Sequence, residues 1–178
     1  VVMTRGSVLL VLTVLFVACS PTVQPEPAIP AGHQPGEETA ILAAMDTYLT
    51  AIATNDVRNL APLQTVEGMT YRAKATGEGE MNIVPAPNSY WIDPAQNDGS
   101  TNRERYWSPT VLIRGSIAVV WAPYEYQLNG TTSHCGVDMF DFIKVDGKWI
   151  VSNSTWTVEP DACPSLMPSD SSIIRPAN

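Results

Sequence analysis

Four side chains in the C-terminal half of the chain could move protons or polarise a carbonyl group: Tyr124, Tyr126, His134 and Asp138. Imidazole and carboxyl groups serve as general acids and bases, and a tyrosine hydroxyl can donate to a developing oxyanion. These four residues are therefore the catalytic candidates. Gly136 lies between the last two and leaves a notch that a ligand, a water or a neighbouring side chain must fill.

The spacing of His134 and Asp138 excludes a direct pair, because residues four apart on a strand have Cα atoms about 13 Å apart. Each residue also has a structural alternative. His134 could be a hydrogen-bonded structural or surface histidine, and Asp138, like Glu125, could pair with an arginine. The available arginines are Arg103, Arg105 and Arg114. Ser133 points to the opposite face from His134, so the sequence does not indicate a serine nucleophile activated by this histidine.

A wider set of aromatic and polar side chains could line a pocket for a small apolar or aromatic molecule. Tyrosine and tryptophan rings line pockets that accept planar ligands, although they also form cores and dimer faces. The predicted ligand-binding residues are Trp107, Trp121, Tyr124, His134, Asp138, Phe140, Asn153 and Thr155.

These residues lie in a segment whose alternating pattern predicts an antiparallel meander. The predicted strands cover residues 103–114, 116–128, 133–144 and 148–157. Asn129-Gly130 and Asp146-Gly147 are typical of hairpin turns. The second turn predicts that Asp138 faces Thr155, and this register places Asn153 and Thr155 on the Asp138 face. Prolines 109 and 123 are expected at a bulge or on an edge.

The preceding segment predicts helices. Apolar residues recur with helical spacing at Ile41, Met45, Tyr48, Leu49 and Ile52. This stripe predicts an amphipathic helix over 37–54, followed by a short helix at 57–61 and a short strand at 69–74. Residues 75–101 are rich in glycine and proline and are expected to be mostly loop. Helices followed by a curled sheet indicate an α+β fold.

The first residues resemble a bacterial lipoprotein signal. Arg5 precedes an apolar run that ends at Ala18-Cys19. The resemblance implies that residues 1–18 are removed and that Cys19 is lipidated, so the protein would be exported and held in the cell envelope by its lipid. Ser20 after Cys19 resembles lipoproteins of the periplasmic face of an outer membrane, if the organism has one. A transmembrane anchor is disfavoured because the run is shorter than the roughly 20 residues that cross a bilayer; an ordinary secretory peptide cut elsewhere remains an alternative.

Composition divides the rest of the chain into three parts. Residues 19–36 are proline-rich and predict an extended tether, residues 37–163 form a single domain, and residues 164–178 predict a flexible Pro/Ser-rich tail pinned only at Cys163. If Cys19 is lipidated, Cys135 and Cys163 remain as an even pair, which favours one disulfide over two independent thiols.

Composition argues against two classes of partner, nucleic acids and metal ions. The net charge is −8 and no cluster of lysine and arginine is present, so nucleic-acid binding is not expected. His33 is the only histidine besides His134, and no Cys/His ligand spacing occurs, so neither a metal site nor another cofactor is predicted.

Several motifs resemble the C-terminal half of the nuclear transport factor 2-like superfamily, in particular its SnoaL-like and lumazine-binding-like domains. They are residues 104–107 (ERYW), 121–126 (WAPYEY), 133–138 (SHCGVD) and 146–149 (DGKW). The resemblance implies a cone of helices on a strongly curved antiparallel sheet, an apolar cavity and, in many members, homodimers formed through the sheet. Ketosteroid isomerases of this superfamily have a tyrosine and two carboxylates in the cavity, but no motif here matches them residue by residue.

The predicted function is therefore an exported, lipid-anchored domain that binds a small apolar or aromatic molecule, or acts as an accessory module, without turnover. One alternative is an isomerase, cyclase or dehydratase that uses Asp138 or His134 as general acid or base. Another is a structural or interaction module that pairs through its sheet. Fold alone does not choose among them.

Overall fold

The structure is a computed structural model that describes residues 35–54, 57–77 and 80–176. The predicted signal peptide, Cys19 and nearly all of the predicted tether lie outside these residues. Within the described ranges, no helix is long and apolar enough to span a membrane.

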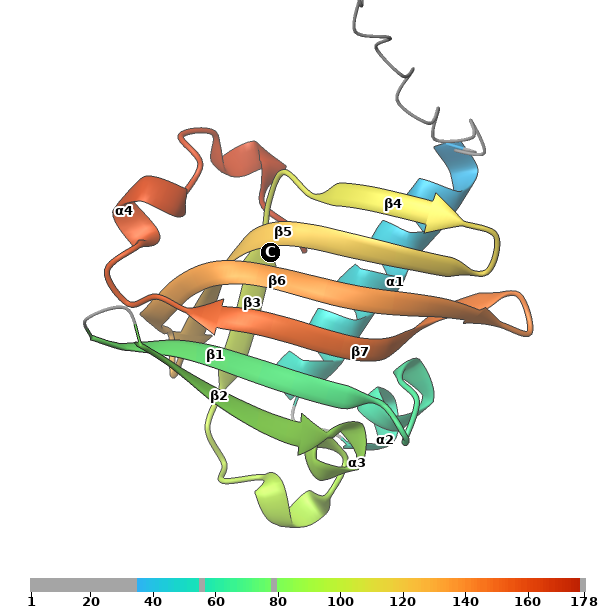
Figure 1. Ribbon diagram of the computed structural model, residues 1–178, viewed down its shortest axis with the longest axis horizontal. Coiled ribbons are helices and arrows are strands. Elements are labelled where there is room, and N and C mark those ends of the chain that lie inside the picture. The colour runs from blue at the N-terminus through green and yellow to red at the C-terminus, as the bar shows by residue number, and fades with distance from the viewer. Residues whose placement is uncertain (1–34, 55–56, 78–79, 177–178) are drawn as a thin grey trace, which may run out of the picture. The chain divides into compact units, whose positions relative to one another are not determined.

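The leading helix α1 (Pro35–Thr54) covers one face of the sheet, which we call the inner face (Figure 1). Its apolar stripe is buried there: Ile41, Met45, Tyr48 and Leu49 are each at most 4% exposed. The predicted helix over 37–54 is thus confirmed. A short helix α2 (Val57–Leu60) and a 3₁₀ turn (Ala61–Leu63) follow it.

Glu37 ties the start of α1 to the sheet. Its carboxylate accepts hydrogen bonds from Lys144 Nζ at 2.7 Å and from Trp149 Nε1 at 2.9 Å. The lysine also pairs with it as an ion. These contacts hold the first turn of the helix against β6 and β7.

The sheet has seven strands in the order β2-β1-β7-β6-β5-β3, and β4 also pairs with β5. It is curved and open, as Figure 1 shows. The strands are β1 (Met69–Gly77), β2 (Glu80–Pro87), β3 (Asn102–Tyr106), β4 (Thr110–Arg114), β5 (Ile117–Leu128), β6 (Thr131–Val145) and β7 (Lys148–Val158). Helices before a large curved sheet confirm the predicted α+β class. One pairing differs from the predicted antiparallel sheet, because β1 runs parallel to β7.

Residues 80–87 form an edge strand where the sequence predicted a loop. β2 pairs with β1 along its whole length, with Pro85 opposite Tyr71 and Pro87 opposite Met69. Prolines are tolerated on an edge, where one side of the strand needs no hydrogen-bond partner. Glycine and proline therefore indicated the edge of the sheet rather than the absence of a strand. The short helix α3 (Asn88–Trp91) follows β2.

The predicted strand over 103–114 is two strands, β3 and β4, separated at Trp107–Pro109. Ser108 has a positive φ of 45°, and Trp107 N donates to Pro123 O at 3.2 Å. This break shifts the register by one residue. An unbroken hairpin that begins at Arg114 and Ile117 would place Glu104 opposite Gln127, whereas Glu104 lies opposite Tyr126.

A bulge in β7 overturns the predicted register of β6 and β7. The pairing is as predicted from Val145 with Lys148 to Phe142 with Val151, but the next pair is Asp141 with Asn153. The extra residue is Ser152, whose hydroxyl donates to Asp141 O at 3.1 Å. Because alternate residues face opposite sides, every later β7 side chain changes face.

The C-terminal segment returns to the domain, so it is not attached at Cys163 alone, as the sequence predicted. The disulfide between Cys135 and Cys163 is present, as predicted, and starts the short helix α4 (Cys163–Leu166). Farther on, Arg175 exchanges backbone hydrogen bonds of 2.6 and 2.7 Å with Tyr106 at the edge of β3. Its guanidinium forms an ion pair with Asp46 of α1 at 2.6 Å.

Candidate functional site

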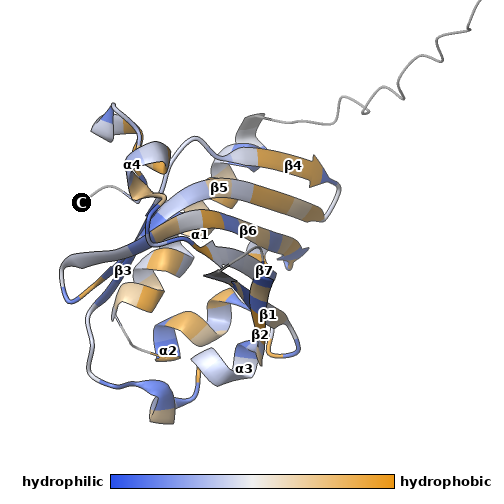
Figure 2. Ribbon diagram, turned by 60° about the vertical axis from the view of Figure 1, so that its left-hand side comes forward, coloured by the Kyte–Doolittle hydropathy of each residue, from blue (hydrophilic) through white to orange (hydrophobic). Residues whose placement is uncertain are grey.

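A cavity of about 370 Å³ lies between the inner face of the sheet, helices α1 and α2, and the segment from α3 to Asn97. Figure 2 shows α1, α2 and α3 gathered on this side of the sheet. Its aromatic lining residues include Tyr48, Trp91, Phe140 and Trp156. The Tyr48 and Phe140 rings meet edge to face with centroids 5.7 Å apart, and Trp91 meets Trp156 at 6.1 Å.

Five of the predicted site residues line this cavity, namely Tyr124, Tyr126, His134, Asp138 and Phe140. They lie on the neighbouring strands β5 and β6 and alternate along each strand, so all project from the inner face. The structure therefore brings together every catalytic candidate, and the predicted shared face of His134, Asp138 and Phe140 is confirmed.

Four predicted ligand-binding residues do not line the cavity. Asn153 and Thr155 leave the Asp138 face because of the β7 bulge, and Ser154 and Trp156 take their places. Asn153 instead accepts a hydrogen bond from Met69 N at 3.0 Å and helps to start β1.

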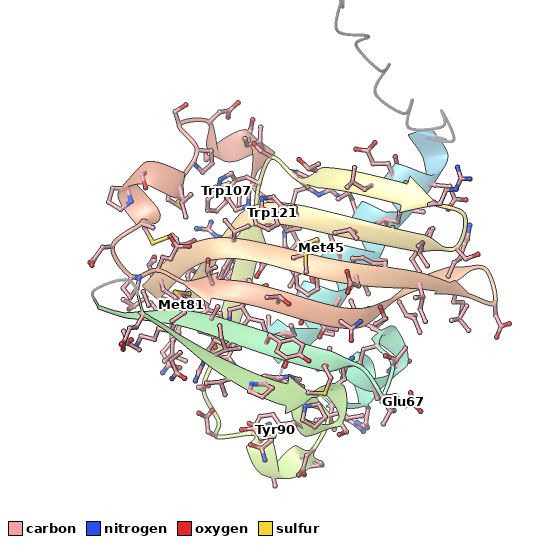
Figure 3. The ribbon with its side chains drawn as sticks, viewed as in Figure 1. Met45, Glu67, Met81, Tyr90, Trp107 and Trp121 are labelled. Atoms are coloured by element: carbon pink, nitrogen blue, oxygen red, sulfur yellow. A yellow bond between two sulfur atoms is a disulfide. The ribbon has the colours of Figure 1, made fainter. Side chains whose placement is uncertain are left out.

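Trp107 and Trp121 also lie outside the cavity. Trp107 follows β3 and is 3% exposed, whereas Trp121 is 52% exposed on the outer face of β5. In Figure 3 both labels are far from that of Tyr90, which lines the cavity. Trp121 lies opposite Met139 and alternates with the inner Ala122 and Val120, so strand alternation directs it outward.

The notch at Gly136 is filled by a neighbouring side chain. A Cβ at this position would lie 2.8 Å from Cε1 of Tyr124 and 2.3 Å from Thr157 O. The Tyr124 hydroxyl donates to Thr157 O at 2.6 Å, so this ring is held by the protein rather than left for a ligand. Glycine is required here because the ring and the backbone approach so closely.

The most distinctive feature of the cavity is a pair of carboxyl groups, Glu104 of β3 and Asp138 of β6. Their side chains hydrogen-bond each other, which requires a shared proton. Asp138 is only 2% exposed, and its Oδ2 has no hydrogen-bond partner among the described residues. None of the arginines that the structure describes pairs with it, whereas Glu125 on the outer face does pair with Arg105.

Burial and mutual repulsion make this pair hold protons. Burial raises the pKa of Glu104 to about 7, although its hydrogen bond with Asp138 opposes the rise. Burial and the adjoining Glu104 raise the pKa of Asp138 well above its usual range. At neutral pH, Asp138 is therefore a neutral acid that donates to Glu104, and Glu104 is poised between its two protonation states.

His134 remains a neutral imidazole in this cavity. Its ring stacks on Tyr126 with centroids 5.1 Å apart, and its Nδ1 lies 3.1 Å from the Ser133 hydroxyl. Burial lowers the pKa of His134, and the nearby charges of Lys74 and Arg72 lower it further. It is therefore an acceptor or donor of hydrogen bonds at neutral pH, and not a cation.

The sequence did not point to Glu104 or Arg72 as cavity residues. Glu104 faces inward only because the β3–β4 break shifts its register, and Arg72 lies on β1, whose parallel pairing with β7 was not predicted. The one signal for Glu104 was its place in the ERYW motif of residues 104–107. Within the described part of the chain, no group of three or more His, Cys, Asp or Glu residues could hold a metal ion.

A comparison with protein-family models finds no match, and neither does a comparison with curated protein sequences. Solved structures do match. An NTF2-like protein from Cytophaga hutchinsonii has 20% identity and a TM-score of 0.55, over 68% of this chain and 98% of the other. An NTF2-like protein of unknown function from Shewanella baltica has 16% identity and a TM-score of 0.51, over 72% of this chain and 98% of the other.

A third similar structure comes from Novosphingobium aromaticivorans and is assigned as the beta subunit of an aromatic-ring-hydroxylating dioxygenase. It has 10% identity and a TM-score of 0.57, over 70% of this chain and 90% of the other. At such identities the likeness concerns the fold and not the chemistry. The domain that carries the Glu104–Asp138 cavity therefore has the nuclear transport factor 2-like fold.

Proposed function

We propose that the protein binds a small, mostly apolar molecule that donates a hydrogen bond to Asp138. The observation that carries this proposal is the unpartnered Oδ2 of Asp138 in a cavity of about 370 Å³ with aromatic walls. A buried acceptor without a donor costs about 1–3 kcal/mol, which a bound donor would recover. The cavity is not filled by Trp107 or Trp121, which supports a binding role over a purely structural one.

Indole is a suitable probe, because it is planar and apolar and has one N–H donor. The full chain in lipid nanodiscs is titrated with indole by calorimetry, and the heat of empty nanodiscs is subtracted. Ser154→Phe places a ring in the cavity, and Thr155→Phe places the same ring on the outer face as a matched control. We expect binding to the wild type and the control but not to Ser154→Phe. Equal binding to all three, or none to the wild type, would refute the proposal.

A second function is favoured by the pKa of Glu104, which is about 7. In this function the Glu104 carboxylate removes a proton from the substrate, while neutral Asp138 donates to Glu104 or to a developing oxyanion. General bases work best when their pKa is near the working pH. The reaction class is that of isomerases, cyclases and dehydratases, with Glu104 in the role that the sequence assigned to Asp138 or His134.

The probe for this function is 5-nitrobenzisoxazole, which loses its C3 proton to a base as its N–O bond breaks and a coloured phenolate forms. We expect a rate above that of empty nanodiscs, rising with pH through about 7. Glu104→Gln should remove the rise, since the amide has no basic carboxylate. Arg105→Gln, which alters an outer-face residue of the same strand, serves as the control. A rate unaffected by Glu104→Gln would exclude Glu104 as the base.

We also propose that the protein is exported and anchored through a lipid on Cys19. The disulfide between Cys135 and Cys163 supports this location, because such bonds persist in oxidising compartments. Metabolic labelling of the host with an alkyne fatty acid tests it. The wild type should be labelled and Cys19→Ser should not, and label on both, or on neither, would contradict the proposal.

The outer face of the sheet supports a homodimer, which is the interaction proposed for this protein. Leu112, Ile117 and Trp121 are 59%, 59% and 52% exposed. They lie on β4 and β5, which are strongly hydrophobic near the turn that joins them, as the orange colour in Figure 2 shows. Native mass spectrometry of the membrane-extracted chain should give a dimer that Trp121→Arg dissociates. Val66→Arg, at another exposed apolar residue, should leave it intact; a monomeric wild type would refute the proposal.

A further inference from the structure

Among the groups that line the cavity, an acceptor and a cation have no partner in the described part of the chain. One is the buried Oδ2 of Asp138. The other is the guanidinium of Arg72, which lines the same cavity and forms no ion pair or side-chain hydrogen bond with any described residue. Asp138 offers an acceptor in the interior, and Arg72 offers a cation at an exposed position.

The strand register gives the spacing between these two groups. Arg72 of β1 lies opposite Trp156 of β7, which lies opposite Asp138 of β6. Neighbouring strands are about 4.8 Å apart, so the Cα atoms of Arg72 and Asp138 are roughly 10 Å apart. The Trp156 side chain projects between them from the same face. Trp156 therefore lies between the two groups, where a ring can pack against it.

Two basic side chains lie at the Arg72 end of the cavity, which Asp93 and Glu104 also line. Lys74 lies on the same strand and face as Arg72, and both act electrostatically on His134. His134 is a neutral imidazole and adds no charge of its own. A cationic ligand would meet both basic side chains at this end, whereas a carboxylate can form a two-pronged pair with guanidinium.

We propose that the ligand is a small planar aromatic carboxylate with a hydroxyl or N–H donor at the opposite end of the ring. Its carboxylate pairs with Arg72, its ring lies against Trp156 and Phe140, and its donor bonds to Oδ2 of Asp138. This inference rests on the proposed binding function and narrows it to one chemical class. Asp138 stays protonated toward Glu104, so its free oxygen accepts a hydrogen bond rather than repelling the anion.

Three probe molecules distinguish the contributions of the carboxylate and of the donor to binding. 4-Hydroxybenzoate has both groups, methyl 4-hydroxybenzoate lacks the charge, and benzoate lacks the donor. Calorimetry with the full chain in nanodiscs should show 4-hydroxybenzoate binding at least about tenfold more tightly than its methyl ester, which cannot form the charged pair with Arg72. It should also bind more tightly than benzoate, which leaves Oδ2 of Asp138 without a donor.

Arg72→Gln should abolish the preference for the acid over its methyl ester and leave binding of the ester unchanged. Lys74→Gln is the comparison variant, because it removes a cation from the same face of β1 at a residue that does not line the cavity. It should weaken the preference less than Arg72→Gln does, because Lys74 acts only through its charge and not through direct contact. The inference is overturned if acid and ester bind equally, if Arg72→Gln weakens both alike, or if none of the three probes binds. The indole experiment stands apart from these outcomes, so the binding function can survive the loss of this ligand class.

Discussion

Glu104 and Asp138 lie on strands separated by β5, yet their carboxyl groups hydrogen-bond each other above it. Two carboxyl groups within hydrogen-bond reach of each other cannot both ionise readily, so one proton stays between them. This pair is the chemical centre of the cavity. Its protonation should therefore be visible in stability as well as in binding.

The first prediction concerns pH and stability. The pKa of Glu104 rises on folding from 4.5 to about 7, so the folded state binds this proton more tightly than the unfolded state. The resulting stabilisation is complete below pH 4.5 and is lost as pH rises through 7, to the extent of roughly 3 kcal/mol. Urea unfolding of the wild type between pH 4.5 and 8 should show this loss.

Glu104→Gln removes the contribution of the pair, because the amide keeps the shape and a hydrogen bond, does not titrate and no longer raises the pKa of Asp138 by its charge. His134 acts in the opposite direction, since its lowered pKa removes stability as pH falls, but it does so equally in both proteins. The difference in unfolding free energy between wild type and variant should decrease as pH rises. A difference that does not vary with pH would show that Glu104 titrates normally in the folded protein.

The second prediction concerns Gly136. Gly136→Ala should destabilise the domain by about 2–4 kcal/mol, because the added methyl would overlap Thr157 O and displace the Tyr124 ring. Gly36→Ala, at a helical position with no atom within 4 Å, should be neutral or slightly stabilising. Equilibrium unfolding in urea compares the two variants. A loss of less than about 1 kcal/mol at Gly136 would mean that the backbone moves aside easily.

The third prediction concerns the disulfide. Cys135 and Cys163 are 28 residues apart, so reduction should lower the free energy of unfolding by about 2–4 kcal/mol. Thermal unfolding with and without dithiothreitol measures this change. The variant with both cysteines replaced by serine should be equally destabilised and should not respond to dithiothreitol. Equal midpoints for the oxidised and reduced wild type would contradict the prediction.

The fourth prediction concerns the C-terminal segment. The Arg175–Asp46 ion pair is partly exposed, with side chains 39% and 27% accessible, so Arg175→Gln should cost less than about 1 kcal/mol of stability. Its local effect should be larger. Amide hydrogen exchange at Arg175 and Tyr106 should become faster, whereas Arg114→Gln should leave both amides unchanged. Unaltered exchange in Arg175→Gln would show that the backbone pairing alone holds this segment.

Local patterns in the chain were sufficient to predict the helix over 37–54, the hairpin at Asp146-Gly147 and the shared face of His134 and Asp138. Each of these depends on spacing between residues close in sequence, where helical and strand periodicity act directly. The disulfide partners also followed from counting cysteines. The α+β class and the NTF2-like resemblance needed little more than these elements in order.

The Glu104–Asp138 pair and the Arg72 cation could not be read from spacing. The break at Trp107–Pro109 shifts the register by one residue and so turns Glu104 inward. The extra residue Ser152 places Ser154 and Trp156, instead of Asn153 and Thr155, on the inner face. Because strand side chains alternate with a period of two, each single-residue shift reverses a whole face. Such shifts are set by hydrogen bonds between residues far apart in the chain, and the composition of the cavity follows from them.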